Sequence, residues 1–194
     1  MARGEPVAVP GPLIEMMLVG QLQDWAADRR RLTRSRQAES VRMLIVTREG
    51  PFWEAVEGRA PLPPAAVTLG WELVAIDPEQ GTIEVAFAAG GAFLNPAGVV
   101  QGGFLAAMLD DTMGPALVCG LEPGDFAPTT DLHVQFLRPA RAGRLVGRGR
   151  VVRRGRDIAF LAGELVDEDG AVVAVATATA QIRGGMLGRP VTRD

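Results

Sequence analysis

Two adjacent acids, Asp110 and Asp111, lie within an apolar stretch that opens with Gln101-Gly102-Gly103. A carboxylate inside an apolar run is costly unless it meets water, a partner or a substrate. The functional interpretation makes one of the two acids a nucleophile or a general base. The alternative is a solvated side chain, or one that caps the next helical turn, and it suits Asp111 better than Asp110.

The glycine pair supplies a different chemical group. We expect one long helix from near Gln101 to near Gly120, with Gly102 and Gly103 in its first turn. First-turn N–H groups have no partner within the helix, and glycine lets another molecule approach them closely. With the positive end of the helix dipole, they could bind a carbonyl oxygen that becomes anionic during a reaction. Asn95, in a turn just upstream, can donate to the same ligand.

The spacing along this helix limits how the two groups can cooperate. Gly102 and Asp110 are eight residues apart, or roughly 12 Å at the rise of an α-helix. Oxyanion donor and base must both lie about 3 Å from one reacting centre. Two antiparallel copies of the helix could meet this requirement, with Gly102 of one chain facing Asp110 of the other. We therefore expect a site at a two-fold dimer interface that occurs twice per dimer.

Alternating apolar patterns on both sides of the helix predict strands. Before it come 68–77 and 81–89, preceded by a short helix that starts at Pro51 and ends at Gly58. After it come three or four strands in 129–140, 143–155, 157–170 and 171–183, with Asp169-Gly170 as a hairpin turn. A lone helix amid antiparallel strands must bury its apolar stripe against the sheet. The sequence thus predicts an α+β domain over residues 51–184.

The flanking segments differ from this domain. Residues 1–50 are expected to form a partly flexible helical extension, and residues 185–194 a flexible tail. The extension carries an apolar stripe at helical spacing: Ile14, Leu18, Leu22 and Trp25. The stripe could form a lid, an oligomerisation helix or a packing extension.

Composition excludes several classes of site. The single histidine, His133, excludes a His-cluster metal site, and its strand-like context favours a structural or surface role. The single cysteine, Cys119, is expected to be a small buried hydrophobe. The net charge of −3 gives no global attraction to nucleic acid. No stretch approaches the ~18 apolar residues of a membrane span. We expect a cytoplasmic protein without membrane or nucleic-acid partners.

The motif residues resemble a known signature. Asn95, Gly98, Gly102, Gly103 and Asp110 are spaced as in the hotdog-fold acyl-CoA thioesterases, most closely the phenylacetate-pathway, or PaaI-like, branch. The stretch PTTDLHVQFLRPARAG is similar to the segment that follows the helix in that family, and the resemblance covers about residues 52–183. It implies a hotdog fold, in which an antiparallel sheet wraps one long helix, and dimers that often pair into tetramers. It also implies hydrolysis of acyl-CoA to a carboxylate and free CoA without metal or cofactor.

The resemblance also implies roles for individual residues. Asp110 would activate water or attack the carbonyl, the Gly102 N–H would hold the oxyanion, and Asn95 would orient the thioester or the water. Thr129 stands at a Ser/Thr position of the family and would offer a hydroxyl beside Asp110, with Thr130 as the neighbouring candidate. Gly103 and Gln101 complete the predicted substrate contacts at the helix start.

Two features leave alternatives open. Gln101 replaces the usual histidine of the motif, and glutamine cannot transfer a proton near neutral pH. A non-catalytic acyl-CoA-binding or interaction module is therefore the second hypothesis, and a hotdog dehydratase, whose chemistry normally uses a catalytic histidine, the third. Arg153 and Arg154, at a strand end, are candidates for gripping CoA phosphates. An ordinary charged surface turn is the alternative for this pair.

Overall fold

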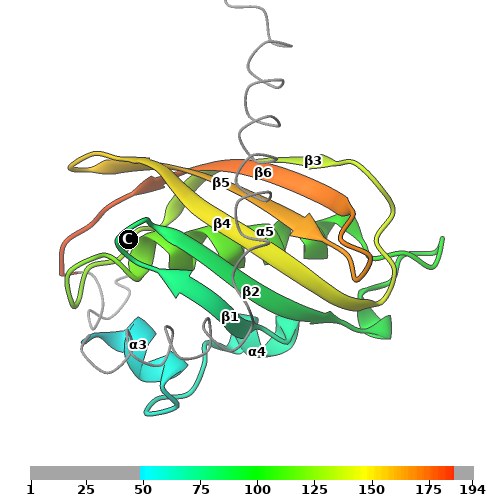
Figure 1. Ribbon diagram of the computed structural model, residues 1–194, viewed down its shortest axis with the longest axis horizontal. Helices are drawn as coiled ribbons and strands as arrows, with labels where there is room; N and C mark the ends of the chain where they lie inside the picture. The colour runs from blue at the N-terminus through cyan, green and yellow to red at the C-terminus, as the bar shows by residue number, and fades with distance from the viewer. Residues whose placement is uncertain (1–48, 186–194) are drawn as a thin grey trace, which may run out of the picture. The chain divides into compact units, whose positions relative to one another are not determined.

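The computed structural model describes residues 49–185, which form an antiparallel sheet with one long helix, α5 (Gly102–Val118), against one face (Figure 1). The expectations for residues 1–48 and 186–194, including the helical extension and its apolar stripe, lie outside the described residues. The other elements are α3 (Pro51–Val56), α4 (Pro64–Leu69), β1 (Glu72–Asp77), β2 (Thr82–Ala89), the 3-10 turn η2 (Gly91–Phe93), β3 (Thr129–Phe136), β4 (Gly143–Arg154), β5 (Ile158–Val166) and β6 (Val172–Gln181).

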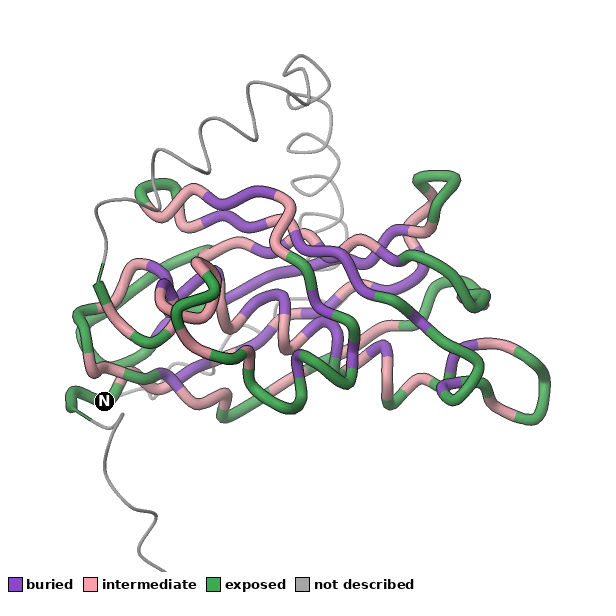
Figure 2. Tube along the Cα trace, turned by 90° about the horizontal axis from the view of Figure 1, so that it is seen from below, coloured by how far each residue is buried: buried purple, intermediate pink, exposed green. Residues whose placement is uncertain are grey.

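The sheet has six strands in the order β1-β2-β4-β5-β6-β3, and all neighbours are antiparallel. The chain reaches the far edge after α5, so β1 and β3 are the two edge strands. Buried positions alternate with less buried ones along β4 and β6, whereas β2 and β5 are buried at most positions (Figure 2). Ile83, Val85 and Phe87 of β2 are almost fully buried. The core therefore lies between the helix and one face of the sheet.

Glycines in β4 and β5 let α5 approach the sheet closely. Adding a Cβ at Gly147 would collide with the hydroxyl of Thr112, and one at Gly149 would lie 2.9 Å from the Thr112 carbonyl oxygen. A Cβ at Gly163 would lie 2.8 Å from Met113. Thr112 is fully buried and its hydroxyl donates to the Met108 carbonyl at 2.7 Å. These contacts fix which side of α5 meets the sheet.

The predicted architecture is confirmed in its main elements. One long helix lies between two preceding and four following strands, and β5 and β6 pair as a hairpin around Gly170, whose φ is 79°. The short helix starting at Pro51 is also confirmed. Within the described residues, no helix combines the length and apolar character needed to cross a membrane.

The prediction of a strand over residues 68–77 was wrong in its first four positions. Residues 64–69 form a second short helix, α4, and the strand starts only at Glu72. Pro64 occupies the first helical turn, and Gly70 ends the helix in the left-handed conformation with φ 65°. Proline at the start and glycine after the end are ordinary helix boundary signals.

Candidate active site

A cavity of about 330 Å³ lies between α5, the α3–α4 segment and the residues that precede β3. Its walls are mostly apolar: Pro51, Phe52, Ala55, Val56, Leu62, Pro63, Ala66, Trp71, Gly114, Pro115, Val118, Phe126, Ala127 and Pro128. Carboxyl and hydroxyl groups enter the lining only from Asp110, Asp111 and Thr129. Among these described residues no side chain is cationic. An apolar cavity with a few converging polar groups is the usual form of a small-molecule site.

Asp110 and Thr129 meet at this cavity. The Thr129 hydroxyl donates to Asp110 Oδ1 at 2.8 Å. The neighbouring Thr130 instead donates to the Thr179 carbonyl of β6 at 3.1 Å, and the pairing of β3 with β6 shifts register between Thr129 and Asp131. This irregularity turns the two threonines to different partners. Of the two candidates from the sequence, Thr129 is the one beside Asp110.

Asp111 is less accessible than a solvated side chain would be. Its backbone carbonyl accepts a 3.0 Å hydrogen bond from Trp71 Nε1. Its side-chain Oδ2 is buried and has no hydrogen-bond partner in the described part of the chain. Burial, and then the charge of Asp110, raise the pKa of Asp111 to about 6. Asp111 is thus half-buried rather than freely solvated, because the Trp71 segment covers this side of the helix.

The start of α5 holds the other predicted residues. The N–H groups of Gly102 and Gly103 donate to no acceptor within residues 49–185. Gln101 occupies the N-cap position, where its side chain makes no capping hydrogen bond. The Asn95 side chain accepts hydrogen bonds from the N–H groups of Ala97 at 2.9 Å and Val99 at 3.3 Å, which shapes the turn before the helix.

Neither the helix start nor the Asn95 turn lines the cavity that contains Asp110. The structure thus brings Asp110, Asp111 and Thr129 together in one chain. It leaves Gln101 and the glycine pair at the start of α5, with Gly102 about 12 Å from Asp110 by helical rise, and Asn95 in the turn before the helix.

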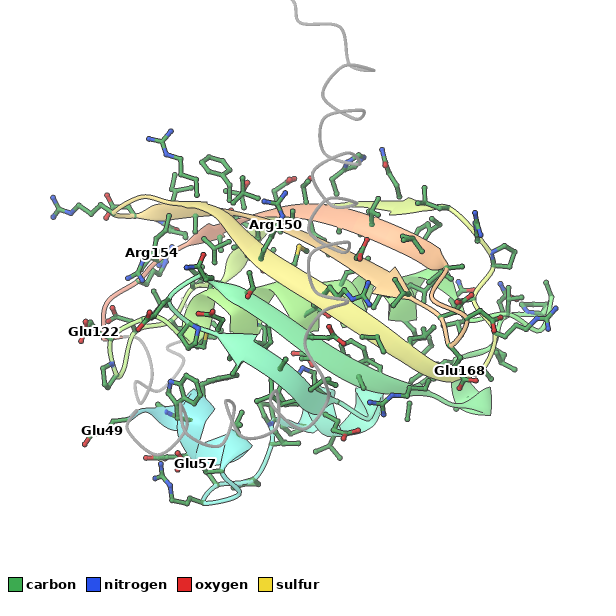
Figure 3. All side chains as sticks on the ribbon, in the orientation of Figure 1. Glu49, Glu57, Glu122, Arg150, Arg154 and Glu168 are labelled. Atoms are coloured by element: carbon green, nitrogen blue, oxygen red, sulfur yellow. The ribbon has the colours of Figure 1, made fainter. Side chains whose placement is uncertain are left out.

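The predicted arginines lie elsewhere. Arg154 Nη1 donates to the Gly120 carbonyl at 2.8 Å, which joins the end of β4 to the segment after α5 (Figure 3). Arg153 is exposed, and neither arginine lines the cavity. His133 is exposed on β3 and Cys119 is buried, as expected for both. Within the described residues, no group of His, Cys, Asp and Glu side chains could hold a metal ion.

The sequence did not identify the walls of the cavity. Of the large apolar side chains Phe52, Trp53, Met108, Met113 and Phe136, which spacing alone does not sort into wall and core, only Phe52 lines it. Trp53, Met108 and Met113 are buried in the core. The ring of Phe136 instead lies 3.0 Å from where a Cβ on Gly102 would be.

Comparison with known proteins shows the family of this chain. The model of the Thioesterase superfamily matches residues 97–174. A phenylacetic acid degradation-related protein from Ralstonia eutropha JMP134 is 48% identical, with a TM-score of 0.65, over 67% of this chain and 98% of that chain. The chain belongs to the thioesterase superfamily. Membership supports thioester hydrolysis as its general chemistry, and the PaaI-like resemblance seen in the motif is confirmed.

Two further solved structures share the fold. A mutant of the phenylacetic acid degradation protein PaaI from Thermus thermophilus is 29% identical, with a TM-score of 0.55, over 61% of this chain and 98% of that chain. The PaaI protein from the phenylacetic acid degradation operon of E. coli is 23% identical, with a TM-score of 0.62, over 69% and 94%. The predicted hotdog fold is confirmed. A comparison with curated proteins returned no match.

The raised pKa of Asp111 predicts a pH-dependent gain in stability for Asp111→Asn. Below the unfolded pKa of 3.8, both states are protonated and the variant should match the parent. As pH rises toward about 6, the unfolded chain loses this proton first, so the parent becomes less stable. Above that pH the variant should be more stable by about 1–2 kcal/mol, after allowing for partial exposure. Urea unfolding at several pH values checks this, and a constant difference from pH 4 to 8 would contradict it.

Proposed function

We propose that the protein hydrolyses acyl-CoA thioesters to a carboxylic acid and free CoA, at a site to which two subunits contribute. The observation that carries the proposal is the hydrogen bond from Thr129 to Asp110 at an apolar cavity of a thioesterase-superfamily domain. The cavity would hold the acyl group, and the carbonyl carbon would lie beside Asp110. No metal or cofactor is needed for this reaction.

In this proposal Asp110 acts as the general base. The Thr129 hydroxyl holds Oδ1 and leaves Oδ2 to take a proton from the attacking water. An acyl group bound between the apolar walls would displace water, which strengthens each electrostatic interaction in the site. A base placed in this way contributes about 10² to 10⁴ in rate.

The oxyanion donor would come from a second copy of the chain. The Gly102 N–H has no acceptor in the described part of its own chain, and it is too far along α5 to serve the same carbonyl as Asp110. Next to it, the edge strand β3 ends in exposed apolar side chains, with Phe136 54% and Leu137 51% exposed. An open strand edge with apolar side chains favours pairing with another copy. Asn95 and Gln101 would enter the partner's site with Gly102.

CoA itself would lie outside the cavity. Arg153 is exposed at the end of β4 and remains a proposed contact for a CoA phosphate, whereas Arg154 is already engaged with Gly120. We also propose a cytoplasmic location, because CoA esters are intracellular substrates and the single cysteine forms no disulfide.

A non-catalytic acyl-CoA-binding module is the second candidate, and Gln101 favours it. Glutamine at the helix start cannot supply the proton that a histidine there could. Tight binding of acyl-CoA without thiol release, across short, aromatic and long acyl groups, would support this candidate against the first.

Replacing Asp110 tests the enzymatic role. We expect the purified protein to release free thiol from at least one member of an acyl-CoA panel, and Asp110→Asn to lower kcat at least about a hundredfold. The matched control is Asp169→Asn, which makes the same change in the exposed β5–β6 turn and should keep full activity. Equal rates for Asp110→Asn and the parent would remove Asp110 from the mechanism.

The two adjacent threonines offer a second matched pair. Thr129→Val removes the hydroxyl that orients Asp110, and should lower kcat about 10- to 100-fold, since a hydrogen bond to a charged group contributes about 1.5–3 kcal/mol. Thr130→Val removes a bond to the β6 backbone and should leave kcat within about twofold. Steady-state thiol release measures both. A larger loss for Thr130→Val than for Thr129→Val would contradict the placement.

A further inference from the structure

Asp111 is a second acid in the cavity, and the reaction as described so far does not use it. Building on the proposed function, we propose that Asp111 donates a proton to the departing CoA thiolate and recovers that proton from Asp110 at the end of each turnover. Asp110 would then act as the general base and Asp111 as the general acid.

The composition of the cavity leaves few other donors. Asp110 and Asp111 both line it, and the remaining described lining residues carry no lysine, arginine or histidine. The α3–α4 segment and the residues before β3 contribute no ionisable side chain to the lining, so Asp110 is the only charged group that faces Asp111 there. The Thr129 hydroxyl is already donated to Asp110. Gln101, at the helix start, cannot transfer a proton.

The surroundings of the two carboxyls suit opposite roles. The Asp110 carboxylate accepts the Thr129 hydroxyl, and a donated hydrogen bond stabilises a charged carboxylate. Oδ2 of Asp111 is buried and has no hydrogen-bond donor among residues 49–185, which disfavours a negative charge on this carboxyl. Oδ1 is not among the buried atoms that lack a partner. Divergent environments for a pair of acids are a common basis for acid and base assignment.

The raised pKa of Asp111 supports its role as the acid. Burial, and then the charge of Asp110, raise the pKa of Asp111 to about 6. An acyl group that fills the cavity would displace the remaining water and raise this pKa further, so the proton would be held when the substrate is bound.

The proton balance closes within the pair. Asp110 takes a proton from water, and the resulting hydroxide adds to the carbonyl carbon to give a tetrahedral oxyanion. When the oxyanion reforms the carbonyl, the C–S bond breaks and the sulfur takes the proton of Asp111, which gives the acid and free CoA. The proton on Asp110 then passes to Asp111, because partial burial favours the protonated form of the Asp111 carboxyl. The net reaction consumes one water and no other reactant.

The test compares two substrates that share an acyl group but differ in the leaving thiol. Acyl-CoA releases an alkyl thiolate, which needs a proton, whereas the 4-nitrothiophenyl ester releases a weakly basic thiolate that does not. For Asp111→Asn we expect kcat on acyl-CoA to fall about 10- to 100-fold and kcat on the aryl thioester to change less than about threefold. Asp111→Glu, which keeps an acid, should recover much of the acyl-CoA rate, and Asp169→Asn should change neither.

The unmodified protein gives a readout that needs no variant. Its kcat on acyl-CoA should fall as pH rises through the pKa of Asp111 in the complex, and its kcat on the aryl thioester should not show this fall. If kcat of Asp111→Asn fell equally on both substrates, or on neither, the inference would be overturned. Hydrolysis by the unmodified protein would still support the proposed function in that case. Absence of thiol release from every substrate by the unmodified protein would overturn both.

Discussion

The close contact between α5 and the glycines of β4 and β5 determines where chemistry can occur in this domain. Thr112 fits against Gly147 and Gly149, so the rotation of the helix about its axis is fixed. At about 100° per residue, Asp110 lies on the side of the helix opposite Thr112, and Asp111 lies between the two sides. Asp110 therefore reaches Thr129, while Asp111 lies beneath the Trp71 segment. One packing constraint thus places two neighbouring acids in different environments.

The second constraint is the length of the helix itself. Its bare amides and its carboxylate are separated by about two turns, and no bending brings them together. If two copies paired along the open edge of β3, each α5 could supply its amides to one site and its carboxylate to the other. Gln101 cannot act as a proton donor at the helix start. A neutral Asp111 would supply that function from the cavity side.

Features that depend on local sequence pattern could be predicted from the sequence. Features that depend on how distant segments pack over one another could not. The long helix, the four strands after it and the Asp169-Gly170 turn followed from periodicity and turn residues. The choice between Thr129 and Thr130 required the register shift in β3, which no alternation of residue types reveals. The burial of Asp111 and the walls around Phe52 depend on how α3 and α4 lie over α5, and α4 itself was missed. Adjacent acids in an apolar helix signalled a site but not which acid would be buried.

Mixed dimers would test the central claim, that each site draws on two subunits, most directly. One chain would carry Gly102→Pro, which removes the N–H at the first helical position and follows a residue with compatible backbone angles, φ −61° and ψ 134°. Any Cβ at this position lies 3.0 Å from the Phe136 ring, so Gly102→Ala, which makes that contact but keeps the N–H, is the matched control. The other would carry Asp110→Asn, and differently tagged chains would be co-expressed and the mixed species isolated. If sites are shared, two inactive parents should give a dimer with one intact site and about half the kcat of the unmodified dimer. A mixed dimer as inactive as its parents would contradict the account.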